Sequence, residues 1–144
     1  MRAVVDASVW VSARLNPKGY PAKVPQAYWK GLYTLVICEE ALAEVGGVLS
    51  RPRIARKYGV TAGDVRTFVE LLRDGAEIVA VQGTVRVGRD PDDYPLVEAA
   101  VVGGADFVVS RDEDLTRDPD VRRYLENKGI GVLTVRQFLE LLAR

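Results

Sequence analysis

Carboxylates are the side chains in this sequence that are best suited to chemistry. The clearest group lies in the segment VVSRDEDL, residues 108–115, where Asp112, Glu113 and Asp114 follow a β-branched run. Like charges this close repel one another, so the group requires either open solvent or a cation that offsets its charge. The 144-residue chain contains no histidine, which excludes Ser-His-Asp triads, histidine general bases and metal sites built on histidine. Any catalysis must therefore use carboxylates, hydroxyls, lysine or arginine.

Composition narrows the class of protein further. The 20 basic and 20 acidic residues balance, so the chain has no net charge that would attract nucleic acid. The single cysteine, Cys38, cannot form an internal disulfide or a zinc site by itself, and we interpret it as a small buried residue. The sequence has no signal peptide and no apolar run of membrane-spanning length, which predicts a cytoplasmic protein without a membrane segment.

The elements that must position the carboxylates alternate along the chain. Short apolar runs, several of them continuous, predict strands that are covered on both faces, at residues 2–7, 33–38, 76–81, 106–110 and 130–135. Amphipathic segments predict helices at residues 39–49, 61–75 and 95–104. Thr61 with Asp64, and Thr134 with Gln137, stand at helix-capping spacing. The pattern predicts one domain over residues 1–144, with a three-layer α/β/α architecture and a largely parallel sheet.

Sheets of this kind place ligands at the carboxyl ends of their strands. Asp6 ends the first predicted strand and Asp112 follows the fourth, so both carboxylates should lie on one rim. Glu44 is flanked by apolar residues on its helix, which predicts that it faces the inner side. Asp93 stands at the start of the helix that leads into the fourth strand.

Each of these acids taken alone has a purely structural explanation. Asp6 could cap the turn after its strand, Glu44 could be solvated, and Asp112 and Asp114 could be loop acids. The segment DPDD, residues 90–93, also fits an ordinary helix start. Four acids from four distant segments on one rim nevertheless favour a divalent metal site, because hard cations such as Mg²⁺ take oxygen ligands. No lysine or arginine motif that would neutralise these acids is evident in the sequence.

Four segments of the sequence together resemble a PIN domain, and more narrowly the PIN-family toxin components related to VapC-type ribonuclease toxins. These segments are VVDASVWVSA (4–13), CEEALAEVGGVLSRP (38–52), RDPDDYPLVEAAVVGGADFVVSRDEDL (89–115) and GIGVLTVRQFLELL (129–142). The resemblance covers nearly the whole chain in order. It implies a three-layer α/β fold and a ribonuclease that depends on Mg²⁺ or Mn²⁺.

The resemblance also implies the residues of the site. The catalytic and metal-holding acids would be Asp6, Glu44, Asp93 and Asp112, with Asp90 and Asp114 as supporting acids. The sequence departs from the family pattern after DPDD, where Tyr94 and Pro95 replace the usual acid or amide and polar residue. Asp92 and Asp90 therefore remain alternatives to Asp93 as the third ligand.

The resemblance implies RNA as the substrate, a homodimer, and a small antitoxin protein that blocks the active site. The basic segment RPRIARK, residues 51–57, could contact the RNA backbone or could simply be a solvated face. A non-catalytic PIN-like module that binds RNA or protein is one alternative. A phosphatase of the HAD type with Asp6 as nucleophile is another, but Ser8 stands where that chemistry usually has a second aspartate.

Overall fold

The computed structural model describes residues 1–111 and 113–144, and the side chains of all of these except residues 113 and 114. Within that part of the chain, five strands form one sheet in the order β3-β2-β1-β4-β5, and every adjacent pair is parallel. The strands are β1 (Arg2–Val5), β2 (Thr34–Ile37), β3 (Glu77–Ile78), β4 (Phe107–Val109) and β5 (Gly131–Leu133). The predicted single α/β domain with a parallel sheet is therefore confirmed.

The remaining elements are helices. The α-helices are α1 (Ala7–Leu15), α2 (Lys23–Trp29), α3 (Glu39–Leu49), α4 (Pro52–Tyr58), α5 (Ala62–Asp74), α6 (Tyr94–Val102), α7 (Glu113–Arg117), α8 (Pro119–Asn127) and α9 (Val135–Leu142). Two short 3-10 helices are η1 (Tyr20–Ala22) and η2 (Pro91–Asp93). No helix in the described ranges is long and apolar enough to cross a membrane.

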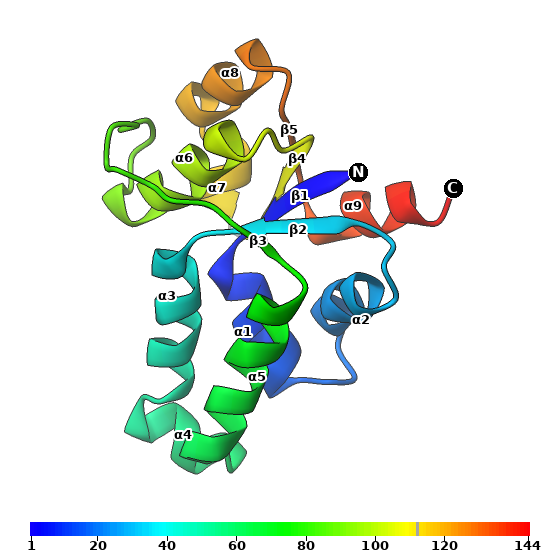
Figure 1. Ribbon diagram of the computed structural model, residues 1–144, viewed down its shortest axis with the longest axis vertical. Helices are drawn as coiled ribbons and strands as arrows, with labels where there is room; N and C mark the ends of the chain where they lie inside the picture. Colours follow the sequence, from blue (N-terminus) through cyan, green and yellow to red (C-terminus); the bar gives the residue numbers. More distant parts are fainter. Residues whose placement is uncertain (112) are drawn as a thin grey trace.

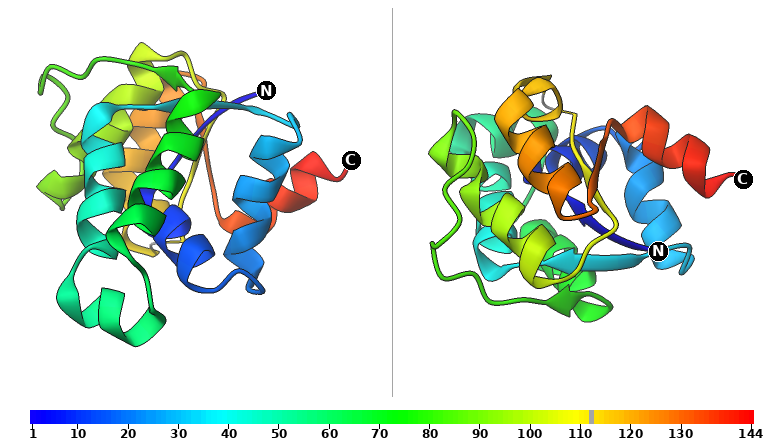
Figure 2. Two further views of the ribbon diagram at one scale, coloured as in Figure 1. Left: turned by 60° about the horizontal axis from the view of Figure 1, so that its bottom comes forward. Right: turned by 90° about the horizontal axis from the view of Figure 1, so that it is seen from above.

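Helices cover both faces of the sheet, as Figures 1 and 2 show. In Figure 1, α6 and α8 lie above the sheet, and α1, α2, α3 and α5 lie below it. Side chains of a strand alternate between its two faces, so β1 supplies Ala3 and Val5 to one hydrophobic core and Val4 to the other. The buried Cys38 belongs to the second core, which agrees with its interpretation as a small buried residue.

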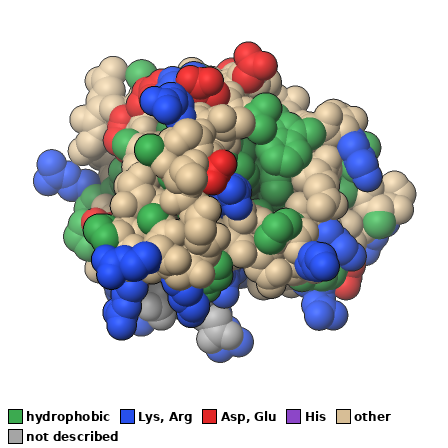
Figure 3. All heavy atoms as spheres, turned by 90° about the horizontal axis from the view of Figure 1, so that it is seen from below, with side chains coloured by type: hydrophobic (Ala, Val, Ile, Leu, Met, Phe, Trp, Pro, Cys, Tyr) green, Lys and Arg blue, Asp and Glu red, His purple; other side chains and the backbone are tan. Residues whose placement is uncertain are grey.

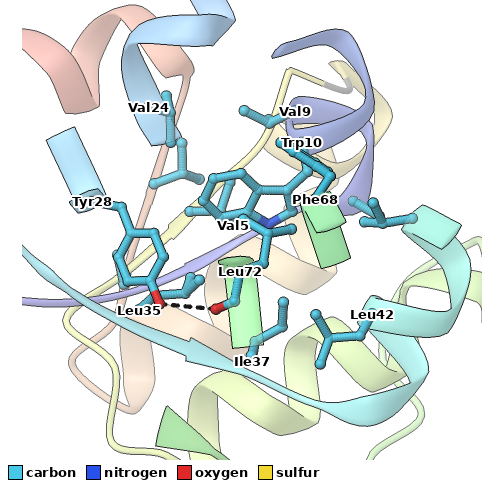
Figure 4. Close-up of a cluster of buried hydrophobic side chains, with 14 of the residues drawn as sticks. Val5, Val9, Trp10, Val24, Tyr28, Leu35, Ile37, Leu42, Phe68 and Leu72 are labelled. Atoms are coloured by element: carbon cyan, nitrogen blue, oxygen red, sulfur yellow. Dashed lines mark hydrogen bonds between the residues drawn. The ribbon is translucent and has the colours of Figure 1, made fainter. Parts of the chain in front are cut away.

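The larger core fixes the helix that begins at the predicted site. Trp10 of α1 is fully buried and packs edge-on against Tyr28 of α2, with ring centroids 6.4 Å apart. The Tyr28 hydroxyl donates a hydrogen bond of 2.9 Å to the Leu72 carbonyl oxygen of α5 (Figure 4). These contacts tie three helices together, so the start of α1 has a defined position relative to the sheet.

Several predicted elements agree with the structure and one is much shorter than predicted. The helix predicted at residues 39–49 has the same bounds as α3, and the capping boxes at Thr61 and Thr134 are both present. The strand predicted at 76–81 is limited to Glu77–Ile78, and both of these residues are exposed. β3 lies at the edge of the sheet and pairs only with β2, so burial on both faces was the wrong expectation there.

Candidate active site

Asp6 lies where β1 ends and α1 begins. Its backbone N–H donates to the Val109 carbonyl oxygen at 2.9 Å, which continues the sheet pairing one residue beyond β1. Its carboxylate caps α1 through a long contact of 3.5 Å from the Ser8 N–H to Oδ1. The other oxygen, Oδ2, accepts a hydrogen bond of 2.9 Å from the hydroxyl of Ser110, a fully buried residue that follows β4. The ends of two neighbouring strands therefore orient this carboxylate.

A cavity of about 310 Å³ opens beside Asp6 and collects side chains from distant segments. It is lined by Asp6, Ala7, Ser8, Val11, Ser12, Glu44, Val48, Asp90, Asp92, Asp93 and Arg111. The acids come from the end of β1, from the middle of α3 and from the segment that forms η2. The structure thus brings three of the four predicted acidic segments to one cavity.

Glu44 lines the cavity together with Val48, although its side chain is exposed and not enclosed by its apolar neighbours. Although Glu44 as a residue is exposed, the protein around its carboxyl partly desolvates that group, which raises the pKa of the carboxyl. The negative charges of Asp6, Asp92 and Asp90 raise that pKa further. The positive charge of Arg51 opposes this shift. Glu44 is therefore electrostatically coupled to acids from two other segments, in the manner expected of a site that binds a cation.

The segment 90–93 brings three acids to the same cavity. Asp90 caps η2, since its Oδ1 accepts a hydrogen bond of 3.0 Å from the Asp92 N–H, and Asp93 directly precedes α6. All three acids line the cavity. The choice of Asp93 over Asp92 and Asp90 as the third ligand stays a prediction.

Two of the predicted acids are not placed. Asp112 lies outside the described residues, and the side chain of Asp114 lies outside them too. Among the described side chains, no three acids or cysteines stand close enough to hold one metal ion by themselves. The donor set still fits Mg²⁺ or Mn²⁺ in its chemistry, because such ions are commonly held by one or two carboxylates together with water and phosphate oxygens.

Arg111 is the feature of the cavity that sequence reasoning missed. Its guanidinium lines the cavity and donates a hydrogen bond to the Ser12 hydroxyl of α1. No arginine or lysine motif that would neutralise the acids was evident in the sequence, yet Arg111 and Arg51 both bring positive charge to them. The signal was present in the sequence, because Arg111 directly precedes Asp112 at the predicted rim.

Glu44 gives a prediction for stability as a function of pH. An acid whose pKa is raised by folding opposes folding when it is ionised, so this penalty grows as the pH rises above the ordinary glutamate value of about 4.3. In EDTA at neutral pH, Glu44→Gln should be more stable than the wild type, and this gain should disappear below about pH 4. Thermal melts across pH test this.

Glu40→Gln is the matched control for this comparison. Glu40 lies in the first turn of α3 and does not line the cavity, and an acid there is favoured by the helix dipole. Its replacement should leave stability at neutral pH unchanged or slightly lower. A loss of stability in Glu44→Gln equal to that in the control would show that Glu44 is not under repulsion from the other acids.

The comparisons with known proteins assign the chain to a family. The PIN domain family matches residues 2–114, which covers most of the chain. An uncharacterized protein of Methanocaldococcus jannaschii is 25% identical over 142 residues, which span 97% of this chain and 90% of that protein. No solved structure matches the chain significantly. A parallel α/β fold and the family match over residues 2–114 lead to one conclusion, which is that this chain belongs to the PIN domain family.

Proposed function

We propose that this protein is a divalent-metal-dependent endoribonuclease that hydrolyses phosphodiester bonds of single-stranded or structured RNA in the cytoplasm. One observation carries the proposal: acids from three separate segments line a single open cavity that also contains an arginine. PIN domains are generally nucleases, and this supports hydrolysis of a nucleic acid as the reaction class. The absence of histidine from the chain is compatible with this chemistry, because its acids and hydroxyls would supply the ligands.

Each residue of the cavity has a role in this proposal. Asp6, Glu44 and one acid of the segment 90–93 would hold Mg²⁺ or Mn²⁺, together with Asp112. A bound divalent ion lowers the pKa of water and offsets charge on phosphoryl oxygens. Asp6 is kept in one orientation by Ser110, which reduces the reorganisation needed when a cation binds.

Arg111 would bind a phosphate of the RNA. A guanidinium is always charged and presents several N–H donors in a plane, which suits phosphate oxygens. The hydrogen bond to Ser12 holds the Arg111 side chain at the edge of the cavity before substrate arrives. The exposed basic helix α4 follows α3, and Lys and Arg side chains occupy much of the lower and side margins of the face in Figure 3. Such charges would favour the approach of RNA toward an acidic cavity.

The proposal is tested by RNA cleavage with purified protein. A labelled single-stranded RNA should be cut internally when Mg²⁺ or Mn²⁺ is present and should remain intact when EDTA is added. Asp6→Asn protein, purified in parallel, controls for contaminating ribonucleases. Equal cleavage with EDTA, or none with either ion, would contradict the proposal. RNA binding without any cleavage would instead support a non-catalytic PIN-like module.

Arg111 provides a separate prediction for substrate binding. Arg111→Gln should raise KM for RNA by about 10-fold. The slope of log Kd against log salt concentration should also decrease by about one, which corresponds to the loss of one phosphate contact. The control is Arg123→Gln, since the Arg123 side chain is 71% exposed on α8 and does not line this cavity. If KM and the salt slope are unchanged in Arg111→Gln, Arg111 does not bind phosphate and only offsets the negative charge of the acids.

We also propose that this nuclease is the toxin of a toxin–antitoxin pair, acts as a homodimer and is inhibited by a small partner protein. The support is the sequence resemblance of the segments around Asp6, Glu44 and 89–115 to the VapC-type branch. Expression in a bacterial host should arrest growth, and expression of Asp6→Asn should not. Normal growth with active enzyme present would remove the toxin role and leave the nuclease role intact.

A further inference from the structure

The segment between β3 and η2, residues 79–90, leads directly to the acids of the cavity. It has no regular secondary structure, and most of its residues are exposed. We call it the connector. A segment without regular secondary structure does not satisfy its own backbone hydrogen bonds. Side chains that accept hydrogen bonds from its N–H groups therefore hold it in place. Two buried carboxylates from other elements do this.

Glu98 of α6 holds the first half of the connector. Its side chain belongs to a residue that is only 2% exposed. The Thr84 and Val85 N–H groups donate to its Oε1 at 2.9 and 3.1 Å, and the Gln82 N–H donates to its Oε2. Three backbone hydrogen bonds compensate the burial of this carboxylate, so the contacts with the connector account for a buried acid at position 98.

Asp118 holds the second half of the connector and divides its two oxygens between different partners. Asp118 is 3% exposed and caps α8, with Oδ1 accepting from the N–H groups of Asp120 at 3.0 Å and Val121 at 3.4 Å. Its Oδ2 accepts from the Arg89 N–H at 3.0 Å and lies 3.6 Å from the Arg89 Nε. The cap of α8 requires only one oxygen. The second oxygen fixes the residue that immediately precedes Asp90.

Close packing at Gly88 reinforces this attachment. Gly88 has φ of +108°, and a Cβ added there would lie 2.8 Å from Val121 Cγ2 and 3.5 Å from Asp118 Oδ2. The connector backbone therefore sits directly against the start of α8, with no room for a side chain. Asp118 and Asp90 also line a neighbouring cavity of about 290 Å³ together with Arg89, Pro91 and Asp93.

We propose that Asp118 is a positioning residue of the active site, which acts by fixing the backbone of Arg89 and thereby the place of Asp90 in the acidic cavity. Asp90 caps η2 through Asp92, so a shift of Asp90 moves the neighbouring acids as well. Asp118 itself does not line the acidic cavity and is not one of the acids assigned to the metal. This inference rests on the proposed function, because it concerns the acids that would hold the divalent ion.

The test uses the full-length variant Asp118→Asn. The amide oxygen of Asn can still cap α8, whereas its NH₂ group would face the Arg89 N–H and remove the acceptor there. Residues that orient metal ligands contribute roughly 10–100-fold to metal affinity. The Kd for Mn²⁺, measured by titration calorimetry without RNA, should therefore rise by at least about 10-fold. The Mn²⁺ concentration that gives half-maximal cleavage should rise by the same factor.

Thr134→Ala is the matched control, because it removes the capping box of α9. This helix lies on the opposite side of the molecule from the connector (Figures 1 and 2). It should lower the melting temperature and leave the Kd for Mn²⁺ unchanged. A loss of stability alone therefore cannot reproduce the result expected of Asp118→Asn. If Asp118→Asn binds Mn²⁺ as the wild type does, Asp118 is only a helix cap and the inference is wrong.

Two further variants test whether Asp118 acts through Asp90. In an Asp90→Asn background, Asp118→Asn should cause a smaller further loss of Mn²⁺ affinity than in the wild type, since residues that act through one another are not additive. Gly88→Ala displaces the connector from α8 and keeps both carboxylates, so it should also weaken Mn²⁺ binding. If Asp118→Asn does not fold, Gly88→Ala decides, and wild-type affinity in that variant overturns the inference. A wild type that neither binds Mn²⁺ nor cuts RNA would refute the proposed function itself.

Discussion

Asp6→Asn is expected to lose RNA cleavage by about 100-fold or more while the protein keeps its fold. A bound divalent ion contributes several kcal/mol to stabilising charge in the transition state, and about 1.4 kcal/mol corresponds to a factor of ten in rate. Asn has nearly the same shape as Asp and is an equally good helix cap, so α1 should remain capped. The loss should therefore appear in kcat, with little change in the melting temperature measured in EDTA. Single-turnover cleavage and thermal melts measure the two quantities.

Ser110→Ala tests the same carboxylate with a smaller expected effect than Asp6→Asn. It removes the 2.9 Å hydrogen bond to Asp6 Oδ2 and leaves the carboxylate in place. A residue that orients a metal ligand typically contributes about 10–100-fold, so this variant should be intermediate in activity. If Asp6→Asn cuts RNA at the wild-type rate, Asp6 is only the cap of α1. The order wild type, Ser110→Ala, Asp6→Asn would identify Asp6 as the group through which Ser110 acts.

The parallel sheet could be predicted from the sequence because the signals for it are local. Continuous apolar runs mark β1, β2 and β4, and Thr–x–x–acid or Thr–x–x–amide spacing marks the starts of α5 and α9. The extent of β3 could not be predicted in this way. Residues 76–81 have strand-like composition, but an edge position with one partner leaves most of them outside the sheet. Which strand lies at an edge depends on the whole topology and not on the segment itself.

Some features of the candidate site could likewise be predicted from local sequence signals, and others depend on contacts between distant residues. The rim position of Asp6 followed from a rule about strand ends, whereas Glu44 was placed by its helix face and the segment 90–93 by its position at a helix start. These residues do line one cavity. Two contacts could not be inferred, namely that of Arg111 with Ser12 and that of Asp118 with Arg89. Each joins residues that are far apart in the chain, and each depends on side-chain directions that no sequence pattern specifies.

Asp112→Asn should abolish activity without lowering stability, whereas the loss of a helix cap would lower stability. The sequence predicts that Asp112 adds one more negative charge to the rim that carries Asp6, and like charges that lie close together repel one another. Without metal, the variant should therefore be as stable as the wild type or more stable. Cleavage should nevertheless be lost, because a ligand is removed. Thermal melts in EDTA and cleavage assays with Mn²⁺ measure the two effects.

Divalent metal should stabilise the wild type and not this variant. A ligand that binds only the folded state adds about 2.7 kcal/mol at 100 times its Kd, which for a chain of this size raises the melting temperature by on the order of 10 °C. Asp112→Asn should gain much less from the same concentration of Mn²⁺ or Mg²⁺. An aspartate that merely caps a helix behaves differently, since its loss costs about 0.5–2 kcal/mol when truncated and its contribution does not depend on metal. If Asp112→Asn melts well below the wild type in EDTA and neither protein responds to metal, Asp112 is structural and the proposed metal site is wrong.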